Sequence, residues 1–401
     1  MAARVGIVGA GPVGVIEAIA CARKGLEVHL FEAEREVDHS PRAATTHPST
    51  LEMLAELGLL EEFRSVGLVA RYFQFWDGAK TLVAEFDHEA LREETPHPYV
   101  VQTEQHKLCE LGLRRLSRMS NVHVRLGTSV TNVSQDADSV RIIAESAEGA
   151  ERHEFDYLIG CDGGRSTVRQ GLDVEFEGYT WPERFLVLTT LFDFQAALGC
   201  CPRNYISDPE EWTNLFKVMG DDLKGRWRAV FPTGEDESDE EAFSEASVRR
   251  RLGRLFDGHP LELLVHRNIY RVHQRVAKSF RKGRIFLAGD AAHVNNPVGG
   301  LGLNCGIHDA MELAETLHLV ASGEAGERLL DRYERRRRQA NIEYVQQQTV
   351  ANKQRLEERE PGVRQANFDA LRRAAADANL QKQFLMRTSL IESVRQARKI
   401  A

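Results

Sequence analysis

Hydrophobic positions near the start of the chain follow two different periods. Apolar runs at residues 4–8 and 27–31 are short and continuous, which is typical of buried strands. Between them, apolar residues recur at helical spacing from Val15 to Ala20, and Gly25 can close that helix as its C-cap. The pattern predicts a strand, a helix and a second strand, as in parallel α/β units.

A glycine-rich turn joins the first strand to the helix. It reads Gly9-Ala-Gly-Pro-Val-Gly14, and Glu32 follows the second strand, 18 residues beyond Gly14. This is the dinucleotide fingerprint in the strand–turn–helix–strand context that it requires. Gly9 permits the tight turn, Gly11 lets a pyrophosphate approach, and Gly14 lets the helix pack closely. Because Glu32 can accept hydrogen bonds from a ribose, the sequence predicts a dinucleotide site.

A late apolar run, residues 285–288, ends at Gly289 and predicts another buried strand. Asp290 follows at its carboxyl end, where open α/β sheets place ligand-contacting groups. Glycines then recur between 297 and 306, so that backbone can approach a flat ligand closely. We expect a helix over 309–319, whose amino end would favour partial negative charge. The alternative is an ordinary strand, turn and helix.

The middle of the chain is dominated by strand patterns. Residues 71–86 predict an antiparallel excursion from the nucleotide sheet, and residues 179–194 and 205–232 are strand-rich and aromatic. Three of the four tryptophans lie in the last two stretches: Trp181, Trp212 and Trp227. We expect a separate layer here. Such aromatics ordinarily fill a core, and the sharper alternative is a flat apolar substrate site.

Composition narrows the class of protein. A chain of 401 residues, 42% hydrophobic and 28% charged, is ordinary for a soluble globular protein of one to three domains. The first strand starts too early for a secretory or transit segment, and no apolar run is long enough to cross a bilayer. The net charge of −8 argues against nucleic acid as a partner, and six cysteines show no metal-ligand spacing. We therefore expect a cytoplasmic, reduced protein without structural metal.

A further motif, Asp162-Gly163 with Ser166-Thr-Val-Arg169, follows an apolar run in the middle of the chain. Together with Gly9–Gly14, Gly289-Asp-Ala-Ala-His293 and the segment from Pro297 to Asn304, it resembles the single-component FAD-dependent aromatic hydroxylases, the p-hydroxybenzoate hydroxylase-like family. The resemblance covers roughly residues 4–345. It implies an α/β fold: an FAD-binding, doubly wound (Rossmann-like) domain, an inserted antiparallel β-sheet substrate domain, and C-terminal helices.

The resemblance also implies domain borders. The expected FAD-binding domain is discontinuous and comprises residues 1–70, 98–178 and 266–350. The substrate-binding sheet domain comprises residues 71–97 and 179–265, and a helical segment comprises residues 351–401.

By motif position, the resemblance assigns residues to the cofactor. The ADP half of FAD falls to Gly9, Gly11, Gly14 and Glu32. The other expected cofactor contacts are Arg42, Gln102, Val130, Asp162, Asp290, Pro297, Gly300, Leu301, Gly302, Leu303 and Asn304. Asp290 would bind the ribityl chain, Pro297 would place a carbonyl beside the flavin, and the Asp162 motif is linked to NAD(P)H. His293 is expected to be structural.

The implied chemistry is reduction of the flavin by NADH or NADPH and its reaction with O2 to a C4a-hydroperoxide, which hydroxylates an electron-rich ring. A deprotonated ring hydroxyl reacts better, so we expect a base or relay, with Tyr205 and His47 as candidates. Arg203 or Arg228 could hold an anionic substrate. The segment around Tyr205 resembles members acting on phenols, resorcinols and hydroxypyridines. The expected partners are a small aromatic substrate, O2 and NAD(P)H, with no nucleic acid, no membrane and a homodimeric state.

Three alternatives remain open at this point. A flavoprotein oxidase or reductase of the same fold would not incorporate oxygen into a product. An escort protein with an FAD fold would bind a lipid or prenylated partner without turnover. A nicotinamide-only dehydrogenase would explain the first motif but not the second and third.

Overall fold

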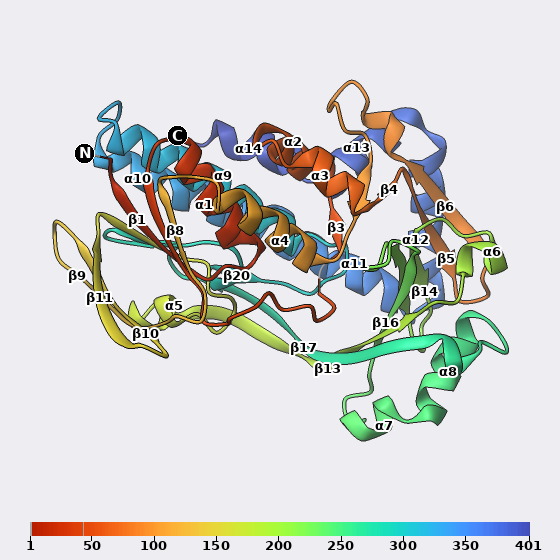
Figure 1. The fold of residues 1–401 in the computed structure, drawn as a ribbon. Helices are drawn as coiled ribbons and strands as arrows, with labels where there is room; N and C mark the ends of the chain where they lie inside the picture. The colour runs from red at the N-terminus through yellow and green to blue at the C-terminus, as the bar shows by residue number, and fades with distance from the viewer. Residues whose placement is uncertain (1, 43) are drawn as a thin grey trace.

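The computed structural model describes residues 2–42 and 44–401 and is organised around two large sheets (Figure 1). The first has six strands in the order β18-β19-β12-β1-β2-β8. Their bounds are Arg281–Lys282, Ile285–Leu287, Tyr157–Gly160, Arg4–Val8, Glu27–Phe31 and Val122–Arg125. All neighbours in this sheet run parallel except the edge strand β18. The predicted doubly wound sheet is therefore confirmed, and its short apolar runs are the kind that sheets covered on both faces require.

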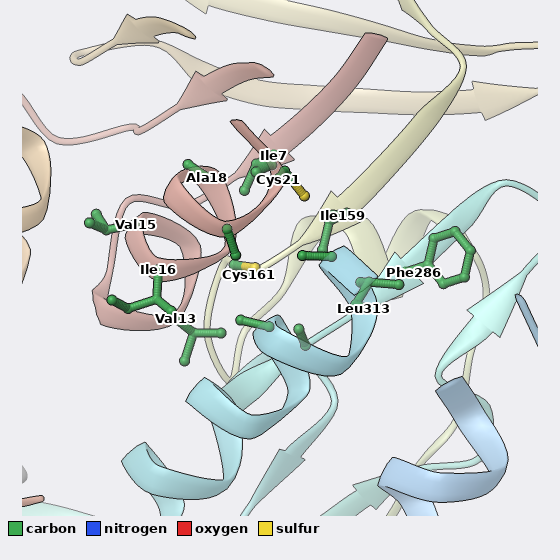
Figure 2. Packing of buried hydrophobic residues seen from close by; sticks show 14 of the residues in the cluster. Ile7, Val13, Val15, Ile16, Ala18, Cys21, Ile159, Cys161, Phe286 and Leu313 are labelled. Atoms are coloured by element: carbon green, nitrogen blue, oxygen red, sulfur yellow. The ribbon is translucent and has the colours of Figure 1, made fainter. Parts of the chain in front are cut away.

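Two helices pack side by side on the first sheet. These are α1 (Pro12–Arg23) and α9 (Gly302–Ala321), whose side chains meet β1, β12 and β19 in Figure 2. Residues of α1 from Pro12 to Ala22 are all buried, and all of them except Glu17 are apolar or glycine, as expected for a helix enclosed in a core. At Gly306 an added Cβ would lie 2.6 Å from the Val13 side chain, so the two helices touch at a glycine.

The late helix begins earlier than the sequence pattern predicts. It starts at Gly302 rather than 309, so the prediction of its first turn was wrong. The glycines at 302 and 306 suggested a loop, but both lie inside the helix. A Cβ at Gly306 would collide with the Val13 side chain at 2.6 Å, and a Cβ at Gly302 would lie 3.0 Å from Asn295 Oδ1. Asp309 consequently lies in the helix interior and is fully buried.

The second sheet has eight strands in the order β20-β17-β13-β16-β15-β14-β5-β6. Their bounds are His293–Val294, Leu264–Ala277, Phe176–Thr190, Arg226–Pro232, Thr213–Val218, Arg203–Ser207, Tyr72–Asp77 and Leu82–Asp87. The sheet is antiparallel as expected, except that β14 and β5 pair in parallel. The long strands β13 and β17 span the molecule from the first sheet to α8 (Glu245–Leu255) (Figure 1).

The two faces of the second sheet have different partners. One face packs in an apolar cluster with α11 (Gln347–Glu357), α12 (Pro361–Ala376), α13 (Ala378–Thr388) and α14 (Ile391–Lys399). The other face is covered by α8 and lies beside α7 (Asp239–Phe243), opposite α11 and α12 in Figure 1. The predicted C-terminal helices therefore pack on the body of the chain.

Smaller elements complete the fold. Two three-stranded sheets consist of β11 (Gly149–Phe155), β10 (Val140–Ser146) and β9 (Ser129–Gln135), and of β3 (Thr45–Thr46), β7 (Val100–Gln102) and β4 (Leu68–Ala70). The other helices are α2 (Pro48–Glu56), α3 (Leu60–Ser65), α4 (Gln105–Leu116), α5 (Thr167–Gly171), α6 (Phe194–Leu198) and α10 (Leu330–Ala340), with a π-helical turn at Asn341–Gln346. Among the described residues, no helix is both long and apolar enough to span a bilayer.

Candidate active site

The fingerprint turn between β1 and α1 is shaped by the protein's own packing. Gly9 has φ +98°, and a Cβ there would lie 2.5 Å from the Cys161 carbonyl oxygen. At Gly14 a Cβ would lie 1.9 Å from the Gly9 carbonyl oxygen. At Gly11, by contrast, no described protein atom lies within 4 Å of an added Cβ. Two of the three glycines thus close the turn, and the third leaves its backbone open to a close approach.

Hydrogen-bond donors gather around this open backbone. Helix α1 starts with Gly11 as N-cap and Pro12 as its first residue, and no side chain caps its first-turn amides in the described chain. Such amides and the helix dipole favour a negatively charged group. Nearby, the Glu32 carboxylate accepts the Ala10 amide at 2.6 Å and the Glu34 amide at 2.9 Å. This holds Glu32 against the turn, where a ribose would need it.

Two carboxylates lie at the ends of neighbouring strands of the first sheet. Asp162 follows β12, and its Oδ2 accepts the Val168 amide at 3.0 Å. Its Oδ1 is buried without a partner in the described structure, and burial raises the pKa of this carboxyl. Asp290 follows β19 and is exposed, yet the surrounding protein raises the pKa of its carboxyl by desolvation. Accessible or unsatisfied oxygens of this kind suit a ligand that donates hydrogen bonds.

A buried charged cluster supports the turn that carries Asp290. Asp309 accepts from His293 Nε2 at 2.6 Å and from Arg337 Nε at 2.7 Å, and the Gly289 amide donates to it at 3.1 Å. Burial alone would lower the pKa of His293, but the Asp309 carboxylate outweighs it and raises that pKa. His293 is thus placed in a structural position, as expected.

Asn304, at the start of α9, ties three segments together. Its Nδ2 donates to the Thr45 carbonyl at 2.9 Å and to the Gly300 carbonyl at 2.6 Å. Its Oδ1 accepts the His47 amide at 2.8 Å. Thr45 in turn donates to Gln102 Oε1 at 2.6 Å, while Gln102 Nε2 is a buried donor without a partner among the described residues. The predicted cofactor residues 102 and 300–304 are therefore brought together.

The other predicted cofactor residues lie around this core. Pro297 is exposed, Gly300, Gly302 and Leu303 are half-buried, and Leu301 is buried. Val130 is buried in β9, and Arg42 is exposed, with its guanidinium donating to Asp38 at 2.8 Å.

Two predicted catalytic and substrate residues, His47 and Arg203, meet at the Gly299 carbonyl, and Tyr205 is linked to them through Arg203. His47 Nε2 lies 2.9 Å from that oxygen, and Arg203 Nη2 donates to it at 3.2 Å. Arg203 also donates to the Tyr205 hydroxyl at 2.7 Å. Burial and the Arg203 charge lower the pKa of His47 well below its usual value, so this imidazole is neutral.

Arg228, the fourth predicted residue, does not reach Gly299. It donates to the Arg42 carbonyl at 3.2 Å, it is only 5% exposed, and burial lowers its pKa. Strand pairing nevertheless puts it on the same face as Arg203, because Arg203 pairs with Phe216 and Phe216 pairs with Arg228. Two strand spacings separate the two arginines by about 10 Å.

Sequence reasoning missed two polar residues on this face. Thr189 pairs with Arg228 on β13, and Asn214 pairs with Tyr205 on β15. Thr189 Oγ1 and Asn214 Oδ1 are buried and lack a partner within the described chain. Only the register between strands reveals them, since neither sits in a recognisable motif.

Comparisons with known proteins identify the family of this chain. The chain matches the family described as FAD binding domain over residues 2–348. It is 36% identical over 387 residues to para-nitrophenol 4-monooxygenase of Pseudomonas sp. (strain WBC-3), covering 95% of this chain and 94% of the relative. It is 34% identical over 368 residues to 6-hydroxy-3-succinoylpyridine 3-monooxygenase of Pseudomonas putida (strain DSM 28022 / S16), covering 90% and 91% of the two chains.

A solved structure shares the whole architecture. The crystal structure of p-nitrophenol 4-monooxygenase from Pseudomonas putida DLL-E4 superposes with a TM-score of 0.89 at 32% identity, covering 98% of each chain. The chain therefore belongs to the FAD binding domain family and is an FAD-dependent aromatic monooxygenase, with NAD(P)H as its electron donor.

Proposed function

We propose that this monooxygenase hydroxylates a small phenolic or hydroxypyridine-like compound. The observation that carries the proposal is the convergence of Arg203, Tyr205 and Gly299 beside the glycine-rich start of α9. The printed names of the two relatives support it, since they refer to a nitrophenol and to a hydroxypyridine.

We propose that the fingerprint turn, Glu32, Asp162, Asp290 and the 300–304 backbone hold FAD. The open backbone over Gly11, the uncapped α1 amides and the unpartnered Asp162 and Gln102 atoms all fit such a cofactor. When bound, FAD supplies the electron transfer and oxygen activation that side chains cannot. We assign supporting contacts to Arg42, Val130 and the Pro297 carbonyl.

Tyr205 is the residue that we assign to the substrate hydroxyl. Its oxygen accepts from Arg203, so its own O–H hydrogen is free to donate to a substrate oxygen. A donor backed by a guanidinium charge favours the ionised form of a phenol. The ionised ring is more electron-rich and reacts faster with an electrophilic oxygen. Neutral His47 then acts as a positioning partner of the Gly299 carbonyl rather than as the base.

The far end of the substrate would lie toward Arg228. The side-chain oxygens of Thr189 and Asn214 lack a hydrogen-bond partner among the described residues on that face. Val187 and Val230 are paired across neighbouring strands and provide buried apolar surface on the same face. We propose that a second polar substituent of the ring is bound by Arg228 and Thr189.

The test is NADH and NADPH oxidation by the FAD-loaded protein with a panel of phenols and hydroxypyridines, followed by product mass under isotopic O2. We expect ligand-stimulated oxidation and one labelled oxygen in the product. Stimulated oxidation without labelled product would favour the oxidase or reductase alternative. Flavin absorbance with no stimulated turnover by any aromatic would favour the escort alternative.

Three further predictions accompany this function. We propose the division into an FAD-binding domain (1–70, 98–178, 266–350), a substrate domain (71–97, 179–265) and a C-terminal segment (351–401), which limited proteolysis would test. A homodimer and a cytoplasmic location also stay predictions, to be checked by light scattering and by fractionation.

A further inference from the structure

A cavity of about 430 Å³ lies on the face of the second sheet that is turned away from the candidate substrate residues. Asn204 and Ile206 of β14 line this cavity. Arg203 and Tyr205 alternate with them along the strand and therefore lie on the opposite face. Strands β5, β14 and β15 form the floor of the cavity, and α6, α8 and the tip of the β5–β6 hairpin border it. The cavity is therefore separate from the candidate active site.

The size and the wall of this cavity are those of a small-molecule site. Such sites usually measure about 300–1,000 Å³ and combine an apolar lining with a few placed polar groups. Here the apolar wall continues the buried cluster under α8 and comes from Trp76, Leu198, Ile206, Leu215 and Leu255. The cavity therefore favours a ligand with a largely apolar body.

The indole of Trp76 is held in place as a flat part of this wall. Its Nε1 donates to Asn204 Oδ1 at 3.1 Å. Asn204 Nδ2 donates in turn to the carbonyl oxygens of Cys201 at 2.6 Å and Leu215 at 3.2 Å, so the amide is itself fixed. Trp76 is only half-buried, and its ring lines the cavity. An indole held in this way offers a stacking surface to an aromatic ligand.

A buried hydroxyl lines the floor of the cavity. Thr213 pairs with Ile206, which pairs with Trp76 on its other side, so the three residues lie side by side on this face. Thr213 is only 3% exposed, and its Oγ1 forms no hydrogen bond with any residue that the structure describes. A buried hydroxyl without a partner is costly, and a polar group on a ligand would satisfy it. Two strand spacings separate Thr213 from Trp76 by about 10 Å.

The charged groups of the lining leave one positive charge without a partner. Arg254 donates to Asp208 at 2.7 Å, and Glu211 accepts from Arg251 at 2.9 Å. Lys80 is exposed at the tip of the β5–β6 hairpin and forms no ion pair within residues 2–42 and 44–401. Because opposite charges attract, the mouth of the cavity favours an anionic group on the ligand.

We propose that this cavity binds a flat aromatic acid of about two fused rings. The ring system stacks on Trp76, its carboxylate lies at the mouth beside Lys80, and a polar ring substituent pairs with the Thr213 hydroxyl. The distance between Trp76 and Thr213 across three strands suits two fused rings better than one. Binding at this site needs no turnover, so its test is independent of the proposed hydroxylation.

The first experiment uses 6-bromo-2-naphthoate as the probe on crystals of the FAD-loaded enzyme. An anomalous bromine peak between Trp76 and Thr213 is expected. The absence of a peak in this cavity would overturn the proposal. A peak found only beside Arg203 and Tyr205 would also overturn it, because the probe would then be a ligand of the candidate active site alone.

The second experiment measures binding of the same probe in solution by titration calorimetry. Ile206→Trp places a large side chain in the cavity and should weaken binding at this site at least about ten-fold. Val265→Trp is the matched control, because Val265 is 44% exposed on β17, outside the cavity lining. Unfolding temperatures show that both variants are folded. Equal binding by Ile206→Trp and the parent would reduce a crystal peak to binding at crystal concentration only and would refute the site.

A third variant tests the charge of the ligand. Lys80→Met should weaken binding of 6-bromo-2-naphthoate about two- to five-fold, the range of an exposed ion pair. Binding of uncharged 2-bromonaphthalene should stay the same in this variant. Unchanged binding of the acid, or an equal loss for both probes, would refute the role of Lys80 and with it the assignment of an aromatic acid.

Discussion

The molecule has two halves that place their functional groups differently. The cofactor half is the six-stranded sheet with α1 and α9, and the substrate half is the eight-stranded sheet. In the cofactor half, contacts come from backbone amides and glycines within short segments such as Gly9–Gly14. In the substrate half, one row of side chains crosses four strands: Arg203, Phe216, Arg228 and Thr189. In the cofactor half, a substitution that moves the backbone removes the contacts themselves. In the substrate half, single side chains can be replaced without moving the strands that carry them.

The largest effect is expected from substituting Gly14, and it should be much larger than the effect of substituting Gly11 in the same turn. Gly14→Ala places a Cβ 1.9 Å from the Gly9 carbonyl oxygen, so the backbone must move. We expect a loss of several kcal/mol in the free energy of unfolding and loss of FAD, measured by urea denaturation and flavin absorbance. Gly11→Ala meets no described protein atom within 4 Å, so it should fold normally and lose only cofactor affinity. Equal stability losses in both variants would contradict the distinction.

The next effect lies in the substrate half. Tyr205→Phe removes the hydroxyl that accepts from Arg203 and leaves the ring stacked on Phe75, with centroids 5.2 Å apart. We expect kcat to fall about 10²–10⁴-fold, the usual contribution of a group that handles a proton, with FAD affinity unchanged. The loss should shrink with substrates that are already ionised at the assay pH. A uniform loss across substrates of different acidity would argue against a role at the hydroxyl.

A smaller effect tests whether the two halves unfold together in acid. His308 in the cofactor half and His88 in the substrate half are buried, and burial lowers their pKa to about 3 and about 4. Because these values lie below the pKa of about 6.5 in an unfolded chain, stability is lost as pH falls below 6.5. Each histidine contributes a slope of at most about 1.4 kcal/mol per pH unit.

The matched variants are His308→Gln and His88→Gln. If unfolding is cooperative, each variant should take up one proton fewer on unfolding between about pH 6 and 4.5, so its free energy of unfolding should fall less steeply with pH there than that of the parent protein. Above about pH 7.5 the free energies of unfolding of both variants should follow curves parallel to that of the parent. The measurement is urea denaturation across that range, followed by tryptophan fluorescence. A change in slope for only one variant would show that its half unfolds separately.

The smallest effect concerns an unsatisfied hydroxyl. Thr189→Val keeps the shape of the side chain and removes the buried Oγ1 that has no partner among the described residues. Stability should stay the same or rise by up to about 1 kcal/mol, because no hydrogen bond within the chain is lost. KM for a substrate with a second polar substituent should rise about three- to ten-fold, which corresponds to one hydrogen bond. An unchanged KM would place the substituent elsewhere.

The same contrast explains how far the sequence could predict the structure. The β1–α1–β2 unit and the carboxylates after β12 and β19 were predictable, because each motif encodes its own local geometry. The start of α9 was not, since Gly302 and Gly306 pack against other segments rather than bend the chain. Thr189 and Asn214 were missed because their place depends on strand register, which spacing along one chain does not reveal.

The contact between Val13 and the late glycines limits how this protein can be recombined. A Cβ at Gly289 or at Gly306 would lie 2.8 Å or 2.6 Å from the Val13 side chain, so residues nearly 300 positions apart share one space. A chimera that imports residues 1–70 from another member inherits a new residue 13 but keeps these glycines. Such a chimera should therefore fold only when the imported residue 13 is no larger than valine, or when the segment that contains Gly289 and Gly306 is exchanged along with residues 1–70.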